Sequence, residues 1–300
     1  MRFHVLIVNF NSVQFVADSI RSLRDEPVTG IHVLDNGSTE PQDPGFEALA
    51  ALDSRVTLHR SEANRGFAGG VNRLAAALDG ADDDILWVLN PDTRVVPGCV
   101  QALTDCLSRH PDAIISPVLL RPDGTIWYAG GAFEPKRGYS AHDHYGESPE
   151  VLGTAVFPTQ FVTGAALTLT KRTWSEVGPL REDLFLYWED TDLSLRAATR
   201  GTPLLVVPGA VVEHLEGGSS SGGKGRSAVY YYYFSRNRII VCAPTAGLLQ
   251  LIVGRGIIET VRALAKPLIK ERDGRWKKTF ASFRGLWAGI RAYRASTTSR

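Results

Sequence analysis

The sequence predicts an α/β fold with a mostly parallel central sheet flanked by helices, and three observations support this prediction. Short apolar segments alternate with helical patterns through the first 110 residues. Polar Asn and Asp residues follow several of these segments directly. Hydrophobic residues make up 44% of the 300 residues, enough for a substantial core. Alternation of this kind is typical of a parallel sheet covered by helices on both faces.

The elements are expected in a simple order along the chain. Strands are predicted at 5–8, 31–34, 56–59 and 85–89, and helices at 12–24, 46–53, 69–78 and 98–109. From 114 to 169 the pattern changes to short strands and turns, with a Gly/His/Tyr-rich stretch at 130–146 that we expect to be partly mobile. Helices at 173–177 and 190–199 and a strand at 204–207 follow. The Gly/Ser-rich residues 216–226 are expected to form a flexible loop that becomes ordered on substrate binding.

Charge is unevenly distributed along the chain. The formal net charge is +1, yet residues 245–300 carry twelve Lys or Arg against three Asp or Glu, which leaves −8 for the remainder. The two parts are therefore expected to meet different partners.

The cysteines Cys99, Cys106 and Cys242 lack metal-ligand spacing and fit a reducing compartment. Residue 1 leads directly into the first strand, so no signal peptide is expected.

Polar residues at the ends of the predicted strands indicate a single site. Asn9 follows the first strand, Asp35 and Asn36 the second, and Asn90 and Asp92 the strand at 85–89. In open parallel sheets, ligands bind outside the carboxyl ends of the strands. A fixed carboxylate or amide at Asp35 and Asn36 suits a nucleobase edge and a ribose hydroxyl. The same Asp-Asn-Gly-Ser sequence is also ordinary turn chemistry.

A glycine-rich turn at residues 64–72 leads into a helix. Backbone N–H groups of such a turn can approach a diphosphate, and Arg65 between Asn64 and Gly66 adds positive charge. The segment lacks the Lys of a Walker loop and does not follow the first strand, as a dinucleotide-binding motif would. A purely structural turn is the alternative.

Two residues are candidate ligands of a divalent cation. Asp92 offers hard oxygen ligands that suit Mg²⁺ or Mn²⁺, and His214 after an apolar strand offers a nitrogen. The alternatives are a helix cap or turn for Asp92 and a structural role for the histidine.

A second acidic cluster is found at residues 187–192. Glu189, Asp190 and Asp192 repel one another and lie at the start of a predicted helix, whose dipole partly stabilises them. Helix capping explains one of these carboxylates, and the others need another function.

The order of six motifs resembles one known family. The motifs are Val8-Asn9-Phe10-Asn11, Asp35-Asn36-Gly37-Ser38, the turn at 64–72, Asn90-Pro91-Asp92, Phe161-Val162-Thr163-Gly164-Ala165 and Trp188-Glu189-Asp190-Thr191-Asp192. Over residues 3–240 this order resembles the inverting glycosyltransferases of family 2, especially the bacterial rhamnosyltransferase-like branch.

The resemblance implies a GT-A fold, a nucleotide-diphosphate sugar donor and a divalent cation, Mg²⁺ or Mn²⁺. It implies that Asp35 binds the nucleobase and that Asp190 is the general base for the acceptor hydroxyl. Asn90 stands where the family's Asp-x-Asp has its first acid, so Asp92 is the better metal ligand. His214 matches a histidine that completes the metal shell. The donor site is expected to comprise Asn9, Asp35, Asn36, Asn64, Arg65, Gly66, Asn90 and Asp92.

The resemblance also indicates an acceptor side. Glu189 is expected to orient the acceptor, Trp188 to line its site, and Asp192 to brace the turn. Arg236 and Arg238 follow the aromatic run 230–234, which lies near the acceptor in related enzymes, and arginine forks suit phosphate oxygens. The alternative is a helix whose aromatic residues pack in the core and whose arginines face solvent.

The predicted donor is dTDP-rhamnose, with UDP-sugars as the alternative, and the predicted acceptor is a polyprenyl-diphosphate-linked glycan, with a soluble acceptor second. Residues 244–300 are expected to form basic amphipathic helices that bind an anionic membrane surface at the cytoplasmic face; no segment approaches the ~20 apolar residues of a membrane span. Packing on the catalytic domain or a homodimer contact is the alternative. No nucleic-acid partner is expected.

We expect a catalytic domain at 1–243, with a nucleotide-sugar half at 1–110 and an acceptor half at 111–243, followed by the helical extension at 244–300. Two other function classes remain open. A nucleotidyltransferase would need a basic glycine-rich signature near the first strand, which residues 9–13 lack. A non-catalytic sugar-nucleotide-binding module would leave the carboxylates at 189–192 without a task.

Overall fold

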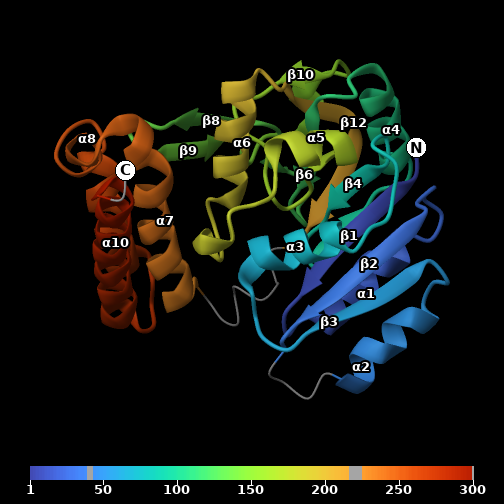
Figure 1. Ribbon diagram of the computed structural model, residues 1–300, viewed down its shortest axis with the longest axis horizontal. Helices are drawn as coiled ribbons and strands as arrows, with labels where there is room; N and C mark the ends of the chain where they lie inside the picture. Colours follow the sequence, from blue (N-terminus) through green and yellow to red (C-terminus); the bar gives the residue numbers. More distant parts are fainter. Residues whose placement is uncertain (39–42, 216–224, 299–300) are drawn as a thin grey trace.

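A ten-stranded sheet forms the centre of the molecule (Figure 1). The computed structural model describes residues 1–38, 43–215 and 225–298. The main strand order is β10-β12-β6-β11-β4-β1-β2-β3, with β5 paired to β12 and β7 to β6. The strands are β1 (Phe3–Asn9), β2 (Gly30–Asn36), β3 (Val56–Ser61), β4 (Ile85–Val88), β5 (Thr93–Val95), β6 (Ile114–Leu120), β7 (Ile126–Tyr128), β10 (Phe157–Pro158), β11 (Thr168–Thr170) and β12 (Leu204–His214).

The sheet is mostly parallel, as the sequence predicts. Strands β3, β2, β1 and β4 run in one direction, and β11 is antiparallel to both β4 and β6. Strands β6 and β12 therefore run in the same direction as β1. The carboxyl ends of these six strands meet at one edge of the sheet, which is the edge where ligands bind in such folds.

Helices cover both faces of the sheet. They are α1 (Val13–Ser22), α2 (Asp43–Ala48), α3 (Gly66–Ala76), α4 (Cys99–Arg109), α5 (Lys171–Val177) and α6 (Glu189–Arg200), with 3-10 turns at Leu49–Ala51, Pro149–Leu152 and Glu182–Leu184. Along β1, Val5 and Ile7 pack with side chains of α1 and α4, whereas Leu6 and Val8 pack with side chains of α3. This alternation makes β1 hydrophobic on both faces, which explains the continuous apolar run in the sequence.

The structure agrees with the sequence prediction in one region and differs from it in another. Residues 130–146, part of the predicted stretch of short strands and turns, contain a β-hairpin made of β8 (Gly131–Glu134) and β9 (Tyr139–His142). Strand β12 is longer than expected, because it continues past a register shift between Val207 and Val211 and ends at His214. The predicted flexible loop at 216–226 lies largely outside the described residues.

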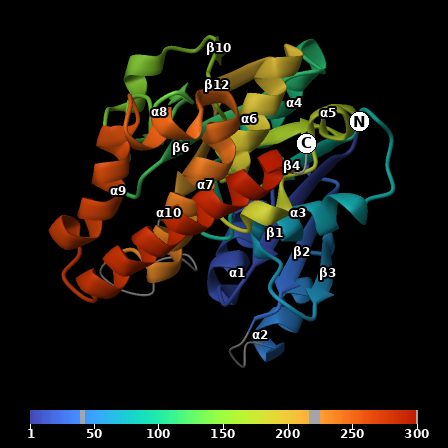
Figure 2. The ribbon, with the colours of Figure 1, turned by 60° about the vertical axis from the view of Figure 1, so that its left-hand side comes forward.

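The C-terminal helices form a separate layer beside the sheet (Figures 1 and 2). They are α7 (Ala228–Ala246), α8 (Leu248–Ile252), α9 (Ile257–Lys270) and α10 (Arg275–Thr298). Helix α10 packs on α7 through small residues: a Cβ at Gly289 would lie only 2.5 Å from the carbonyl oxygen of Arg236. The domain boundary predicted between residues 243 and 244 falls inside α7, and the division itself stays a prediction.

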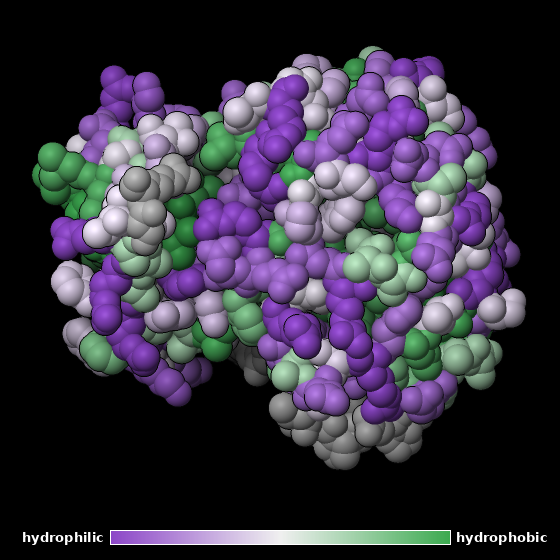
Figure 3. Space-filling model, viewed as in Figure 1, coloured by the Kyte–Doolittle hydropathy of each residue, from purple (hydrophilic) through white to green (hydrophobic). Residues whose placement is uncertain are grey.

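The C-terminal layer carries most of the exposed apolar side chains. Of fourteen large hydrophobic residues that are exposed in the described chain, ten lie between Leu249 and Trp287. Figure 3 shows this apolar surface at the left edge, over the C-terminal helices. No helix within the described ranges has the length and apolar composition needed to span a membrane.

Candidate active site

Polar strand ends meet at the carboxyl edge of the sheet, as predicted. Asn9 at the end of β1 lies beside Asp35 in the β1–β2 register. Both side chains are buried. Ser38 donates its backbone N–H to Asp35 Oδ1 at 3.1 Å, and its hydroxyl lies 3.5 Å from Asn9 Nδ2. These contacts fix Asp35 at the end of β2, and its binding of a nucleobase stays a prediction.

The glycine-rich turn is held in shape by asparagine side chains. Asn36 Nδ2 donates to Gly66 O at 2.9 Å and to Asn64 Oδ1 at 3.2 Å, and Asn36 Oδ1 accepts from Arg65 N at 3.1 Å. Gly66 has φ +72°, and a Cβ there would collide with the carbonyl group of Phe185. Asn36 and Asn64 therefore shape the turn from inside, and their direct contact with a donor stays a prediction.

The acidic cluster at α6 follows a strained backbone segment. Phe185, Tyr187 and Trp188 have φ of 65°, 69° and 73°, values that cost non-glycine residues about 1–3 kcal/mol each. The fully buried side chain of Asn237 on α7 compensates, because its Nδ2 lies 2.8–2.9 Å from the carbonyl oxygens of Leu184, Leu186 and Tyr187. Sequence reasoning missed Asn237, whose only signal is its position between the two arginines considered above.

One short segment joins the two acidic clusters. Gly164 donates its backbone N–H to Asp190 Oδ2 at 2.9 Å, while Asn90 donates its backbone N–H to Ala165 O at 2.9 Å. A Cβ on Gly164 would lie 3.2 Å from the Phe67 ring, so the donor turn also reaches this point. The structure thus brings the β4 end, the glycine-rich turn and the start of α6 into one site.

Glu189 and Asp190 differ sharply in environment. Glu189 is buried, and its Oε2 has no hydrogen-bond partner among the described residues. Burial raises the pKa of the Glu189 carboxyl well above its usual value, and the negative charge of Asp190 raises it further. Asp190 is only partly buried, and its carboxylate accepts three hydrogen bonds, two of them from Thr191.

Asp92 and His214 lie side by side, as the resemblance implies. Asp92 Oδ1 and His214 Nε2 are 3.5 Å apart, and both side chains are buried. Octahedral Mg²⁺ binds ligands at about 2.1 Å, which places neighbouring ligand atoms about 3 Å apart. The pair therefore fits two ligands of one cation. The described residues contain no group of three or more His, Cys, Asp or Glu suited to a metal. A cation held by this pair would therefore need ligands other than a third residue of these types.

His142 on β9 was not predicted and lies close to both parts of the site. Its Nδ1 is 2.7 Å from Trp127 O, and the Trp127 ring packs on both His142 and His214 with centroids 4.6 and 4.4 Å apart. Burial lowers the pKa of His142. The charge of Asp190 raises this pKa, and that of His214 lowers it. The sequence offered one signal, the unusual His content of the stretch at 130–146.

The remaining predicted residues lie around this centre. Trp188 is buried at the N-terminus of α6, and its Nε1 has no hydrogen-bond partner in the described chain. Asp192 braces the turn as expected, through ion pairs with Arg196 and Arg181 at 2.8 and 3.4 Å.

The two arginines of α7 contact protein groups rather than the carboxylates. Arg236 Nη1 donates to Asp183 O and to Asn237 Oδ1. Arg238 is buried and donates to Thr260 Oγ1 and to several backbone carbonyls, among them Gly138 O and Gly256 O. Both side chains therefore fasten α7 to neighbouring segments, and their contact with an acceptor stays a prediction.

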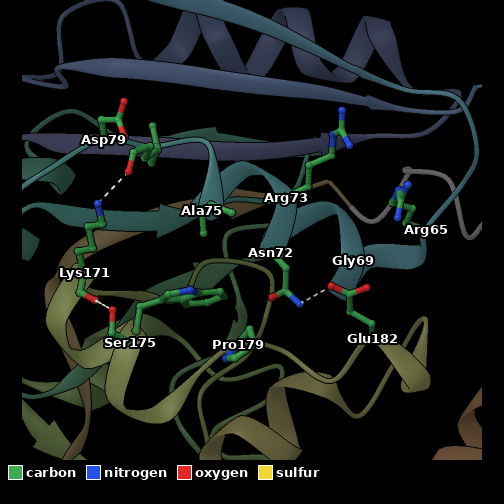
Figure 4. Close-up of a pocket in the computed structure, with 13 residues that line it drawn as sticks. Arg65, Gly69, Asn72, Arg73, Ala75, Asp79, Lys171, Ser175, Pro179 and Glu182 are labelled. Carbon is green, nitrogen blue, oxygen red and sulfur yellow. Dashed lines mark hydrogen bonds between the residues drawn. The ribbon is translucent and has the colours of Figure 1, made fainter.

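A cleft of about 690 Å³ lies between α3 and α5 (Figure 4). Arg65 and Lys171 lie at its opposite ends, and Asn72 crosses it to donate to Glu182 Oε1 at 3.0 Å. None of the predicted carboxylates lines this cleft, and Arg65 is the one predicted donor residue that does. The carboxylate site is therefore separate from this cleft.

Comparison with known proteins identifies the family of this chain. The family model described as glycosyl transferase family 2 matches residues 4–154. The N-acetylglucosaminyl-diphospho-decaprenol L-rhamnosyltransferase of Mycobacterium tuberculosis is 30% identical over 217 residues, which are 64% of this chain and 68% of the relative. The galactofuranosyltransferase GlfT2 of Mycolicibacterium smegmatis is 25% identical over 255 residues, 76% of this chain and 38% of the relative.

A solved structure supports the GT-A fold. GalNAc-T7, solved with UDP, GalNAc and Mn²⁺, superposes with a TM-score of 0.61 at 16% identity, over 87% of this chain and 54% of that one. This chain thus spans about half the length of that protein. Since the family model covers half of the sequence and the strand ends carry its motifs in order, this chain belongs to glycosyl transferase family 2.

Proposed function

We propose that this glycosyltransferase is inverting and moves rhamnose from dTDP-rhamnose to a hydroxyl of a polyprenyl-diphosphate-linked glycan. The observation that carries the proposal is the segment Thr163–Ala165, which binds Asp190 with one N–H and the end of β4 with a carbonyl. The name of the mycobacterial relative supports both the sugar and a lipid-linked acceptor. UDP-sugars are the second choice of donor.

Asp190 is the general base in this proposal. Its partly exposed carboxylate takes the proton of the acceptor hydroxyl, whose oxygen attacks the anomeric carbon while the bond to the nucleotide diphosphate breaks on the opposite face. Attack from that side inverts the anomeric configuration. Gly164 N–H and Thr191 hold the carboxylate in place, and general-base catalysis contributes roughly 10²–10⁴-fold. Glu189, whose pKa burial raises, orients the acceptor by hydrogen bonding.

The donor is held by the strand ends and a cation. Asp35 and Asn9 bind the nucleoside, and Arg65 lies beside the diphosphate. Asp92 and His214 would hold Mg²⁺ or Mn²⁺, and Asn90 lies two residues before Asp92. A bound cation would neutralise charge that grows on the leaving diphosphate. The Mn²⁺ in the GalNAc-T7 structure supports a divalent metal.

The C-terminal layer is proposed to rest on an anionic membrane at the cytoplasmic face. Trp276, Phe280, Phe283 and Trp287 form an aromatic stripe at helical spacing on α10, each between 52% and 74% exposed. Lys and Arg residues surround the stripe, and each basic residue contributes about 1 kcal/mol near an anionic surface. The alternative is that this aromatic stripe forms a homodimer contact.

A donor screen tests the proposed function. The full chain is incubated with dTDP-rhamnose, other dTDP-sugars or UDP-sugars, Mg²⁺ or Mn²⁺, and a short-chain isoprenyl diphosphate N-acetylglucosamine. We expect dTDP release and rhamnosyl transfer fastest with dTDP-rhamnose, with inverted configuration by NMR, and loss of both on adding EDTA. Retention of configuration, or pyrophosphate release from a nucleoside triphosphate and a sugar phosphate, would contradict the proposal.

A further inference from the structure

A groove of about 610 Å³ runs between the β8–β9 hairpin, α7 and α9. Trp188, the buried residue directly before Glu189 and Asp190, lines this groove. Its outer part is bordered by Val261 and Ile269 on α9, which are 54% and 75% exposed. The groove therefore connects the apolar surface of the C-terminal layer with the carboxylate site.

The inner wall of this groove is aromatic. The rings of Tyr230 and Phe234 stack with centroids 5.2 Å apart, and the Phe234 and Trp188 rings follow at 5.5 Å. Trp188 Nε1 is buried without a hydrogen-bond partner in the described chain. An aromatic wall with a buried donor suits a sugar ring, whose apolar face packs on aromatic carbons and whose hydroxyls accept hydrogen bonds.

Two lysines of α9, Lys266 and Lys270, line the groove, and Arg226 lies near them on the Tyr230 ring without lining it. The Arg226 guanidinium lies 4.4 Å and Lys266 Nζ 6.0 Å from the centroid of the Tyr230 ring, and Lys270 lines the same wall one turn further along α9. Burial lowers the pKa of Lys266, and the charge of Arg226 lowers it further. Cations held this close together are stabilised when an anion binds between them.

The acidic groups nearby are already paired. Glu259 on the groove wall accepts from Arg137 at 2.9 Å and from Arg262 at 3.0 Å. Glu271 accepts from Lys278 Nζ at 2.5 Å and from the Tyr231 hydroxyl at 2.8 Å. Within the described residues, Arg226, Lys266 and Lys270 therefore keep positive charge available for a ligand.

We infer that this groove binds the isoprenyl diphosphate of the acceptor, with the diphosphate at Lys266 and Lys270, the isoprenyl chain against Val261 and Ile269, and the sugar against Trp188. The inference rests on the proposed function and specifies its acceptor subsite. Such an acceptor joins a sugar, a diphosphate and a lipid, and this one groove is lined by an aromatic wall, by two lysines and by exposed apolar side chains.

Binding to the full chain tests the inference without requiring activity. Farnesyl diphosphate, farnesol and inorganic pyrophosphate are titrated by calorimetry. We expect farnesyl diphosphate to bind at least about tenfold more tightly than either fragment, and K266E/K270E to weaken it at least about tenfold, because charge-assisted phosphate contacts are lost. I269S should weaken farnesyl diphosphate but not pyrophosphate. The matched control K277E/R284E reverses the same number of exposed charges on α10, outside the groove, and should bind like the wild type.

Equal affinity for pyrophosphate and farnesyl diphosphate would overturn the lipid assignment, and unchanged binding by K266E/K270E would overturn the site.

A transfer assay separates this inference from the proposed function. With a farnesyl-diphosphate N-acetylglucosamine acceptor, K266E/K270E should raise the acceptor KM at least about tenfold and leave the donor KM unchanged. If the wild type transfers sugar but K266E/K270E leaves the acceptor KM unchanged, the groove is not the acceptor site. If no acceptor is glycosylated, the proposed function fails, and the calorimetric binding result still shows whether the groove binds an isoprenyl diphosphate.

Discussion

Adjacent carboxylates in this chain have different surroundings. Glu189 is enclosed and has an oxygen without a partner, whereas Asp190 is partly exposed and accepts hydrogen bonds from Gly164 and Thr191. Such a pair separates two tasks, because a neutral carboxyl donates a hydrogen bond while a charged one accepts a proton. The sequence alone shows two acids and no difference between them.

Asp190→Asn should abolish transfer while leaving donor binding intact. Asparagine keeps the shape and the contact with Gly164 but does not accept a proton, so we expect kcat to fall at least about a hundredfold. Single-turnover transfer and a donor titration measure the two quantities separately. Turnover within a few-fold of the wild type would move the base to another residue.

Glu189→Gln should be tolerated far better. Because burial raises the pKa of Glu189 well above its usual value and so favours the neutral carboxyl, an isosteric neutral amide preserves its shape and a hydrogen-bond donor, and kcat should change less than about threefold. The same single-turnover assay applies, with Glu189→Ala as the comparison that removes the donor. A loss in Glu189→Gln as large as in Asp190→Asn would mean that Glu189 acts as a carboxylate.

At the scale of elements, α7 positions the catalytic segment from outside. Asn237 binds three carbonyl oxygens of the strained turn before α6, so a C-terminal helix fixes the backbone that carries Asp190. Asn237→Ala should lower kcat at least about tenfold, leave the donor KM unchanged, and cost about 1–3 kcal/mol of unfolding free energy. Denaturant unfolding and steady-state kinetics give both values. Full kcat in a destabilised variant would limit Asn237 to a purely structural role.

Three histidines form a row across β1, β2 and β3. His4 Nδ1 lies 3.1 Å from His32 Nε2, and the His32 and His59 rings are 5.8 Å apart. Burial, and then the charges of the two neighbouring histidines, lower the pKa of His32 to about 4. The unfolded chain therefore binds more protons than the folded chain between about pH 6.5 and pH 4, so stability falls as the pH is lowered through this window.

His32→Gln should reduce that acid sensitivity. Between pH 7 and pH 5 we expect the wild type to lose on the order of 1–3 kcal/mol of unfolding free energy, and the variant to lose measurably less. Urea midpoints at the two pH values provide the measurement. His110→Gln, at an exposed position after α4, is the control and should behave like the wild type. Identical pH dependence in all three proteins would show that the row does not set the acid limit.

At the scale of the whole molecule, the chain combines a catalytic sheet with a helical layer of opposite charge and apolar surface. Because α10 packs on α7 through Gly285 and Gly289, removing residues 245–300 would expose the core of this layer. Substitution of the exposed aromatic stripe is therefore the cleaner test of membrane binding.

The full chain should sediment with vesicles that contain anionic phospholipid, and high salt should weaken this binding. Replacing Trp276, Phe280, Phe283 and Trp287 by Ser should reduce it at least about tenfold, because these side chains no longer enter the interface. Tyr145→Ser/Val151→Ser, at two residues that are 54% exposed on the catalytic part, is the control. Unchanged sedimentation would exclude the stripe, and a dimer that dissociates in the four-residue variant would assign it to a homodimer contact.

The sequence by itself determined the elements and the edge of the sheet where chemistry occurs. Apolar periodicity is local, so β1, β2, β4 and the acidic start of α6 were predicted within a few residues, and with them Asp35, Asp92 and Asp190. The order of motifs along the chain is also a property of the sequence alone, so it identified the family without the structure.

Only the tertiary structure decided how these pieces meet. Gly164 joins the two acidic clusters, Asn237 supports the strained turn, and His142 enters the site from a hairpin expected to be partly mobile. Each of these contacts joins residues from separate elements, and neither periodicity nor composition records which distant backbone groups become neighbours. The raised pKa of Glu189 arises in the same way, because burial is set by packing of the whole molecule and not by local sequence.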